Sequence, residues 1–249
     1  MSRVNYSREL DREIQAIEAS GAKPRLLLHS CCAPCSSYVL EYLREYFRIT
    51  VFYYNPNITE SAEYAYRLAE EKRLIGEYNR QVETQDFAGM HSTPGAMKIG
   101  ILEAPYDPED YLTAVRGYEE CREGGDRCGI CFSMRLDASA RAAKEGGFDF
   151  FTTTLTISPL KNAERLNEIG QMCGARYGVP FLPSDFKKKD GYKRSIELSG
   201  QFGLYRQNFC GCIFSKEASE KRAKYSAAGN GHKQQSERIR QNTDRATAH

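Results

Sequence analysis

Residues 26–47 read LLLHSCCAPCSSYVLEYLREYF, and this stretch predicts a strand, a loop and a helix in succession. The apolar run at 26–29 has the length of a buried strand, and the loop follows at 30–37. Residues 38–47 carry apolar side chains at helical spacing. Residues 49–54, ITVFYY, are β-branched and aromatic and predict a second strand. The chain therefore begins with a strand–helix–strand unit.

The rest of the chain continues this alternation. Helices are predicted at 61–79, 108–120, 132–145, 163–177 and 194–202, and strands at 81–85 and 148–157, with irregular chain at 86–106. The pattern predicts an α/β fold: a doubly wound, mostly parallel sheet with helices on both faces, plus cysteine-rich insertions. Residues 1–226 are expected to form a single catalytic domain, and the polar residues 227–249 a flexible tail.

Composition excludes several classes of protein. The 249 residues are 41% hydrophobic and 27% charged, which is globular usage and excludes wholesale disorder, collagen-like repeats and coiled coils. No apolar run approaches the 18 or so residues of a membrane helix. The first residues, MSRVNYSRELDREIQ, lack the apolar core of a signal peptide. We therefore expect a cytoplasmic protein with no membrane partner.

Positive charge is local. The net charge is only +2, but residues 216–249 carry eight basic and four acidic side chains, and Lys187, Lys188 and Lys189 are consecutive. Such patches suit an anionic partner such as RNA. The alternative is that the tail and the loop are simply solvated, and charge alone favours this interpretation.

The nine cysteines carry the most information. Seven of them fall in three tight groups: CCxxC at 31–35, CxxC at 128–131 and CxC at 210–212. The number is odd, and the density is far below that of a disulfide scaffold. Cysteines grouped in this way in a cytosolic protein usually bind metal or perform redox chemistry.

Four of these cysteines are candidate ligands of one metal centre. Cys128 and Cys131 are three residues apart, so two thiolates can reach one centre. Cys31 and Cys32 are adjacent, and their side chains are expected to diverge, which suits a single zinc ion poorly. The separated corners of an iron–sulfur cluster suit them better, so iron–sulfur is favoured and a structural four-cysteine zinc site remains the alternative.

Three further positions have weaker support. Cys210 and Cys212, with one glycine between them, can form a strained and labile disulfide, ligate a metal, or be unrelated turn residues. Cys35 is either a further ligand or a thiol at a helix start without a chemical role. Asp185, beside the lysine run, is a candidate proton donor or metal ligand, although a loop aspartate is more often a turn residue.

Seven motifs together resemble one known family. They are LLLHSCCAPCSS, YYNPNI, EYxxR from Glu63 to Arg67, GGDRCGICFSMRL, TTTLTISPLKN, SDFKKKDGY and YRQNFCGCIFS. In this order they resemble the cobalamin-independent epoxyqueuosine reductases, often called QueH. The resemblance runs from about residue 26 to residue 215, and it implies a nucleotide-hydrolase-like α/β architecture.

The resemblance also implies a reaction. Epoxyqueuosine at the wobble position of tRNA would lose its epoxide oxygen and become queuosine, with two electrons from an iron–sulfur site and an unidentified electron donor. Cys31, Cys32, Cys128 and Cys131 would hold a 4Fe-4S cluster. Cys210 and Cys212 would be the redox-active pair or the ligands of a second, mononuclear iron.

The same resemblance suggests the remaining roles. Asp185 or Tyr192 would protonate the leaving oxygen. Phosphates of the tRNA would contact Lys187, Lys188, Lys189 and Arg194.

Two other functions stay open at this point. One is an iron–sulfur tRNA sulfurtransferase, but that class carries an SGGxDS loop after its first strand, where this chain has SCCAPCSS. The other is a zinc-stabilised RNA-binding module without catalytic activity. Iron, sulfide and zinc analysis separates these functions.

Overall fold

Four parallel strands form the central sheet. A computed structural model of the chain describes residues 4–91 and 94–224, and in these residues the strand order is β3-β2-β1-β4. Their bounds are Arg25–Ser30 for β1, Arg48–Tyr53 for β2, Gly100–Glu103 for β3 and Phe150–Thr153 for β4. β1 is central, because Leu26 pairs with Ile49 on one side and with Phe150 on the other. The predicted parallel α/β sheet is confirmed.

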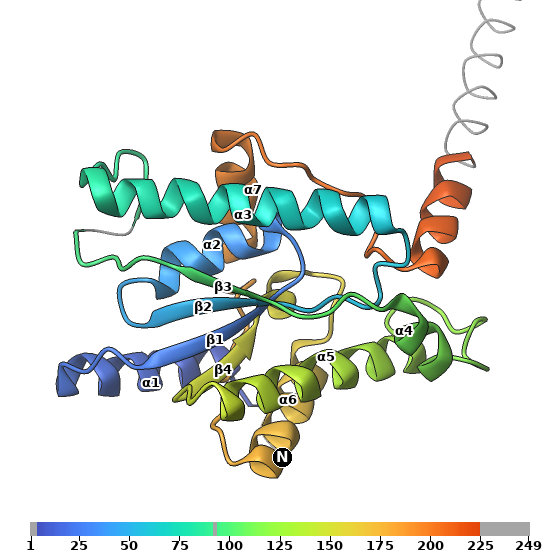
Figure 1. Ribbon diagram of the computed structural model, residues 1–249, viewed down its shortest axis with the longest axis horizontal. Coiled ribbons are helices and arrows are strands. Elements are labelled where there is room, and N and C mark those ends of the chain that lie inside the picture. Colours follow the sequence, from blue (N-terminus) through green and yellow to red (C-terminus); the bar gives the residue numbers. More distant parts are fainter. Residues whose placement is uncertain (1–3, 92–93, 225–249) are drawn as a thin grey trace, which may run out of the picture. The chain divides into compact units, whose positions relative to one another are not determined.

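Helices cover both faces of this sheet. They are α1 (Tyr6–Ser20), α2 (Ala33–Leu43), α3 (Ser61–Thr84), α4 (Pro108–Ala114), α5 (Asp126–Glu145), α6 (Ala163–Tyr177) and α7 (Gly191–Gln201), and a 3-10 turn, η1 (Thr154–Ile157), follows β4. Figure 1 shows α2 and α3 on one side of the strands and α5 and α6 on the other. The fold is therefore doubly wound, as predicted.

β1 is apolar throughout because both of its faces are covered. Successive side chains of a strand point to opposite faces. Leu26 and Leu28 accordingly pack with α2 and α3, whereas Leu27 packs with α5 and α6. All three side chains are fully buried. Their burial fixes β1 in the middle of the sheet and places its carboxyl end, with the cysteines, between two helical layers.

The structure corrects several predicted boundaries. Residues 81–85 are not a strand: α3 continues to Thr84, because the buried Gln81 accepts a hydrogen bond from the Arg44 guanidinium (2.9 Å) and is held against α2. The third strand is instead β3, inside the stretch predicted to be irregular. It is four residues long and mostly exposed, so it shows no apolar alternation.

Two further corrections concern the cysteines. The predicted loop at 30–37 ends early, since α2 begins at Ala33 with Pro34 in its first turn. α5 begins at Asp126 rather than at 132, so Cys128 and Cys131 lie in its first two turns.

The predicted strand at 148–157 is divided, because Thr153 accepts a hydrogen bond from the Leu155 amide and turns the chain into η1.

The chain divides into two compact units, Met1–Arg206 and Gln207–His249, and each is described separately. The first holds every element named above. In the second, residues 213–224 are helical. The predicted tail at 227–249 lies outside the described residues. A single domain ending at 226 thus stays a prediction. Within 4–91 and 94–224, no helix is long and apolar enough to cross a membrane.

Gly191, the first residue of α7, offers a test of this packing. A Cβ atom there would lie 2.0 Å from the Phe186 carbonyl oxygen and 2.4 Å from the Tyr38 ring. We expect Gly191→Ala to lower the free energy of unfolding by about 1–3 kcal/mol through overpacking. Gly200→Ala is the matched control in the same helix, because nothing lies within 4 Å of its Cβ position. Thermal unfolding should show the first variant destabilised and the second unchanged or stabilised; equal melting temperatures would contradict the described α2–α7 packing.

Candidate functional site

Three thiols meet at the carboxyl end of β1. The sulfur atoms of Cys31, Cys32 and Cys35 all lie within 4.8 Å of one another, and those of Cys31 and Cys32 are 3.6 Å apart. β1 ends at Ser30 and α2 begins at Ala33, so the connection is only two residues long. The first turn of α2 then returns Cys35 to Cys32, whose carbonyl accepts from the Cys35 amide (3.1 Å). The expected divergence of the two adjacent cysteines was wrong: their sulfurs converge.

The chemistry of this set fits a thiophilic metal. Three sulfur donors within ligand distance, at the strand end where α/β proteins bind their ligands, could hold a metal ion. Among the described residues, no group of three or more such ligands includes Cys128 or Cys131. Cys35, whose role the sequence left open, is thus the third member of the group.

The three thiols do not ionise alike. Hydrogen bonds from Cys32 and Cys35, helped by the charges of Lys161 and Arg135, hold the pKa of Cys31 well below its ordinary value despite burial. The hydrogen bond to Cys31 raises the pKa of Cys32 to about 12, and the pKa of Cys35 is raised for the same reason. The group therefore holds one thiolate, that of Cys31, which accepts hydrogen bonds from the other two thiols. A metal that binds all three sulfurs has to displace protons from the other two.

Cys128 and Cys131 lie on α5, at the adjoining part of the site. The Gly124 amide donates to the Cys128 sulfur (3.2 Å), and the Arg135 guanidinium approaches the Cys131 sulfur (3.9 Å). Cys128 packs against the same apolar cluster that contains Cys31 and Cys32. The structure thus brings the CxxC pair into the neighbourhood of the CC pair without joining all four sulfurs in one ligand group.

Arg135 fixes this arrangement from α5. Its guanidinium donates to His29 Nε2 (3.1 Å) and to Asn55 Oδ1 (2.6 Å), in addition to its contact with Cys131. Asn55 in turn donates to the Ser30 carbonyl oxygen (2.9 Å). The ends of β1 and β2 and the start of α5 are therefore tied through one buried cation.

His29 is held neutral by the same contact. Its burial, and then the charge of Arg135, lower its pKa to about 3. Nδ1 lies 2.8 Å from Thr153 Oγ1, and Nε2 lies 3.1 Å from both the Arg135 guanidinium and the Tyr54 carbonyl oxygen. The histidine consequently connects β1 to β4 and carries no positive charge at neutral pH.

A buried carboxyl group lies beneath the cysteine loop. Glu71 of α3 faces the hydroxyls of Ser36 and Ser30, and neither of its oxygens has a hydrogen bond among the described residues. Burial raises its pKa to about 7. Close by, Arg67 forms an ion pair with Glu63 (2.7 Å), and its charge also acts on Cys32. α3 therefore places one nearly neutral acid and one cation behind the thiols.

The other predicted site residues lie in separate places. Asp185 is ion-paired with Lys187 (2.7 Å) and lines a cavity of about 700 Å³ together with Lys161. Tyr192 is exposed. Arg194 is engaged by the buried carboxylate of Glu41 (2.7 Å), which occupies the guanidinium expected to contact phosphate.

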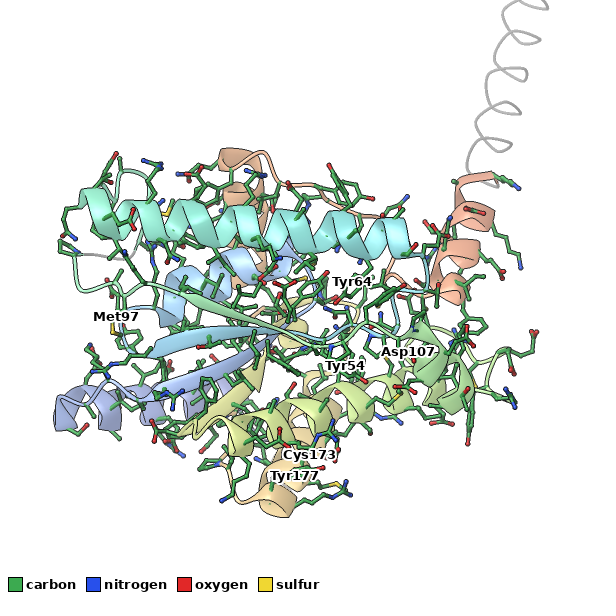
Figure 2. The ribbon with its side chains drawn as sticks, viewed as in Figure 1. Tyr54, Tyr64, Met97, Asp107, Cys173 and Tyr177 are labelled. Atoms are coloured by element: carbon green, nitrogen blue, oxygen red, sulfur yellow. The ribbon has the colours of Figure 1, made fainter. Side chains whose placement is uncertain are left out.

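Cys210 and Cys212 belong to the second unit. No cysteine of the described residues is in a disulfide, so the disulfide considered for this pair is not formed. Gly211 between them has φ of 116°, a conformation that favours glycine. Cys212 caps the following helix, since its carbonyl accepts from the Ser215 amide (3.1 Å). Cys173, labelled on α6 in Figure 2, is buried in the apolar core.

Sequence reasoning missed Arg135, Glu71 and Asn55. Arg135 has a detectable pattern, because it lies four residues after Cys131 and hence on the same face of a helix. Asn55 follows a predicted strand directly, beside Tyr54, which Figure 2 labels past the end of β2. Glu71 has no such pattern, since a single carboxylate on a charged helix looks like a solvated residue.

Comparison with known proteins decides the family. A family model described as epoxyqueuosine reductase QueH matches residues 26–218. The chain belongs to the QueH family. Among curated relatives, the epoxyqueuosine reductase QueH of Streptococcus pyogenes serotype M1 is 41% identical over 213 residues, covering 86% of this chain and 78% of the relative. The QueH protein of Staphylococcus epidermidis is 40% identical over 86% of this chain and 85% of its own length. That of Thermotoga maritima is 34% identical over 81% and 95%.

Glu71→Gln tests the buried carboxyl group. Because the pKa of Glu71 is raised to about 7, this residue stabilises the fold below its unfolded pKa, and the contribution is lost as pH rises through 7. Glutamine does not titrate, so the variant should gain stability relative to wild type between pH 5 and 8, on the order of 3 kcal/mol. His29 is present in both proteins, so its own pH-dependent contribution to stability does not appear in the difference between them.

The measurement is the difference in melting temperature between variant and wild type across that pH range. Glu77→Gln, on the exposed side of α3, is the control and should show no trend. A constant difference for Glu71→Gln from pH 5 to 8 would show that the carboxyl group is not buried as described.

Proposed function

We propose that this chain reduces epoxyqueuosine in tRNA to queuosine. The observation that carries the proposal is membership of a family whose curated relatives bear this name, in a chain whose thiols converge at the end of β1. The reaction breaks the two C–O bonds of the epoxide and forms a C=C bond. It consumes two electrons and two protons and releases the oxygen as water, so the protein is an oxidoreductase that needs an electron donor.

Cys31, Cys32, Cys128 and Cys131 would hold a 4Fe-4S cluster, with Cys35 beside it. The low pKa of Cys31 and the cations Arg135, Arg67 and Lys161 around it favour thiolate ligands. When bound, the cluster supplies electrons one at a time, and a second, mononuclear iron would supply Lewis acidity to the epoxide oxygen.

The chain's own residues complete the reaction. Oxidation of the Cys210 and Cys212 thiols to a disulfide releases two electrons and two protons, the amounts that the reduction consumes. The pair is not disulfide-bonded, and the reduced thiols are the form able to donate them. Asp185, half-buried beside Lys187, would hold the proton for the leaving oxygen. A tRNA substrate agrees with the expected cytoplasmic location.

Iron, sulfide and zinc analysis after anaerobic purification tests the proposal first. We expect about four irons and four sulfides per chain from one 4Fe-4S cluster, and a fifth iron where the second site is filled. The protein should also convert epoxyqueuosine tRNA to queuosine tRNA with a chemical reductant. A colourless protein with about one zinc ion and no turnover would contradict the proposal and favour the zinc-stabilised RNA-binding module.

Cys210→Ser and Cys212→Ser separate the two sets of cysteines. Each should abolish turnover with iron and sulfide content unchanged, because the proposed electron-donating pair needs both sulfurs. Cys173→Ala is the control, since Cys173 packs in the core between α6 and the sheet, and it should retain turnover. Normal turnover by Cys210→Ser would remove the pair from the mechanism.

A further inference from the structure

A cavity of about 700 Å³ opens next to the cysteine site. It is bounded by the start of α1, the start of α6 and the loop that carries the lysine run. The side chains that matter for its chemistry are Arg8, Asp11, Lys161, Glu164, Asp185 and Lys188. The described mechanism uses only one of these, Asp185.

The lining has an excess of positive charge. Five cationic side chains, those of Arg8, Lys161 and residues 187–189, face three carboxylates. Two of the cations are committed, since Lys187 pairs with Asp185 (2.7 Å) and Lys189 with Asp11 (2.6 Å). These pairs hold the walls in place, and the net positive charge of the lining makes the cavity attractive to an anion.

Short polar contacts connect the cavity to the thiols. The Cys31 sulfur lies 3.8 Å from Thr154 Oγ1 in η1. Two residues further, the hydroxyls of Thr156 and Ser184 are 3.0 Å apart, and Asp185 follows Ser184. Lys161, on the cavity wall, is near enough for its charge to act on Cys31. An anion in the cavity would therefore be connected to the thiols through η1 and through Lys161.

The loop that forms one wall is held rigidly. Asn167 of α6 donates to the Ser184 carbonyl oxygen (2.8 Å) and accepts from the Ser184 amide (2.9 Å). Phe186 is buried in the same apolar cluster as Leu10 of α1. The lysines that follow Phe186 are thus presented at a fixed distance from α1, as a preorganised binding site requires.

We propose that this cavity binds a phosphate group of the tRNA backbone close to the nucleotide being reduced. The inference rests on the proposed function, which supplies the tRNA. Lysine and arginine side chains are the usual phosphate ligands in RNA complexes, and such contacts position the substrate without reading its sequence. The start of α6 also lines the cavity, and a helix N-terminus favours an anion.

α1 has a binding role in this proposal. The match to the family model begins at residue 26, after α1 has ended at Ser20. Yet Arg8 and Asp11 of α1 line the cavity, and Leu10, Ile14 and Ile17 anchor the helix in the core. In this proposal α1 contributes side chains to the RNA-binding site, although it lies before the part matched to the family.

Binding of unmodified tRNA by the full chain tests the inference. Fluorescence anisotropy should be recorded over a series of salt concentrations for wild type, Arg8→Glu and Lys188→Glu. Each reversal should weaken binding about tenfold and lower the slope of log Kd against log salt by about one, because one phosphate contact is lost. Arg12→Glu is the matched control on α1: Arg12 is exposed, pairs with Glu9 and does not line the cavity, so its Kd should stay within twofold.

The outcomes separate the inference from the proposed function. Unchanged affinity and salt slope in both cavity variants, with melting temperatures equal to wild type, would overturn the phosphate site. Arg8→Gln supports it by an intermediate loss of affinity, since it removes the charge without reversing it. If wild type binds tRNA, the cavity variants lose affinity and wild type nevertheless fails to reduce epoxyqueuosine, the phosphate site stands and the proposed function falls.

Discussion

The arrangement of the site depends on one buried guanidinium. Arg135 comes from α5, and its hydrogen bonds reach His29 at the end of β1 and Asn55 just after β2. A buried cation is tolerated only when its donors are satisfied, so these acceptors and the Cys131 sulfur are fixed in position together. The helix with the CxxC pair cannot move relative to the CC loop unless this network breaks. It also forces His29 to stay neutral, which leaves the thiols as the ionisable groups at this strand end.

Charge around the thiols is arranged for an anionic centre. Arg67 comes from α3, Arg135 from α5 and Lys161 from the segment before α6, and each acts on Cys31 or Cys32. These three cations are far apart in sequence and converge only because the sheet brings its carboxyl ends to one edge. Such surroundings stabilise thiolate ligands and, with hydrogen bonding and burial, tune the potential of any redox centre that they hold. Glu71 is an exception, since no hydrogen bond to it is formed among the described residues; burial raises its pKa to about 7, and protonation lowers the cost of its burial.

The sequence was sufficient for the strands and helices with a strong local pattern. Leu26 to Leu28 and residues 49–54 are buried on both faces, so composition alone identified β1 and β2. β3 was not predicted, because four mostly exposed residues at a sheet edge have no apolar pattern. Its strand character comes from pairing with β2. The convergence of Cys31 and Cys32 was also missed, since it depends on the backbone at the start of α2. Glu71 was invisible as a site residue for a related reason: burial of a charged side chain is a tertiary property.

The lysine loop, residues 184–189, connects the proposed phosphate site to the thiols. Its first residues are fixed to η1 through Ser184, and η1 touches Cys31 through Thr154, whereas its last lysine is paired with Asp11 of α1. A phosphate bound between α1 and this loop would be positioned by the same backbone that positions the thiols. The candidate metal-binding cysteines lie between β1 and the first turn of α2 and on α5, all within the part matched to the QueH family, but one wall of the cavity comes from a helix before it. Under the proposed phosphate site, changes in α1 would alter how tightly RNA is held while leaving these cysteines in place.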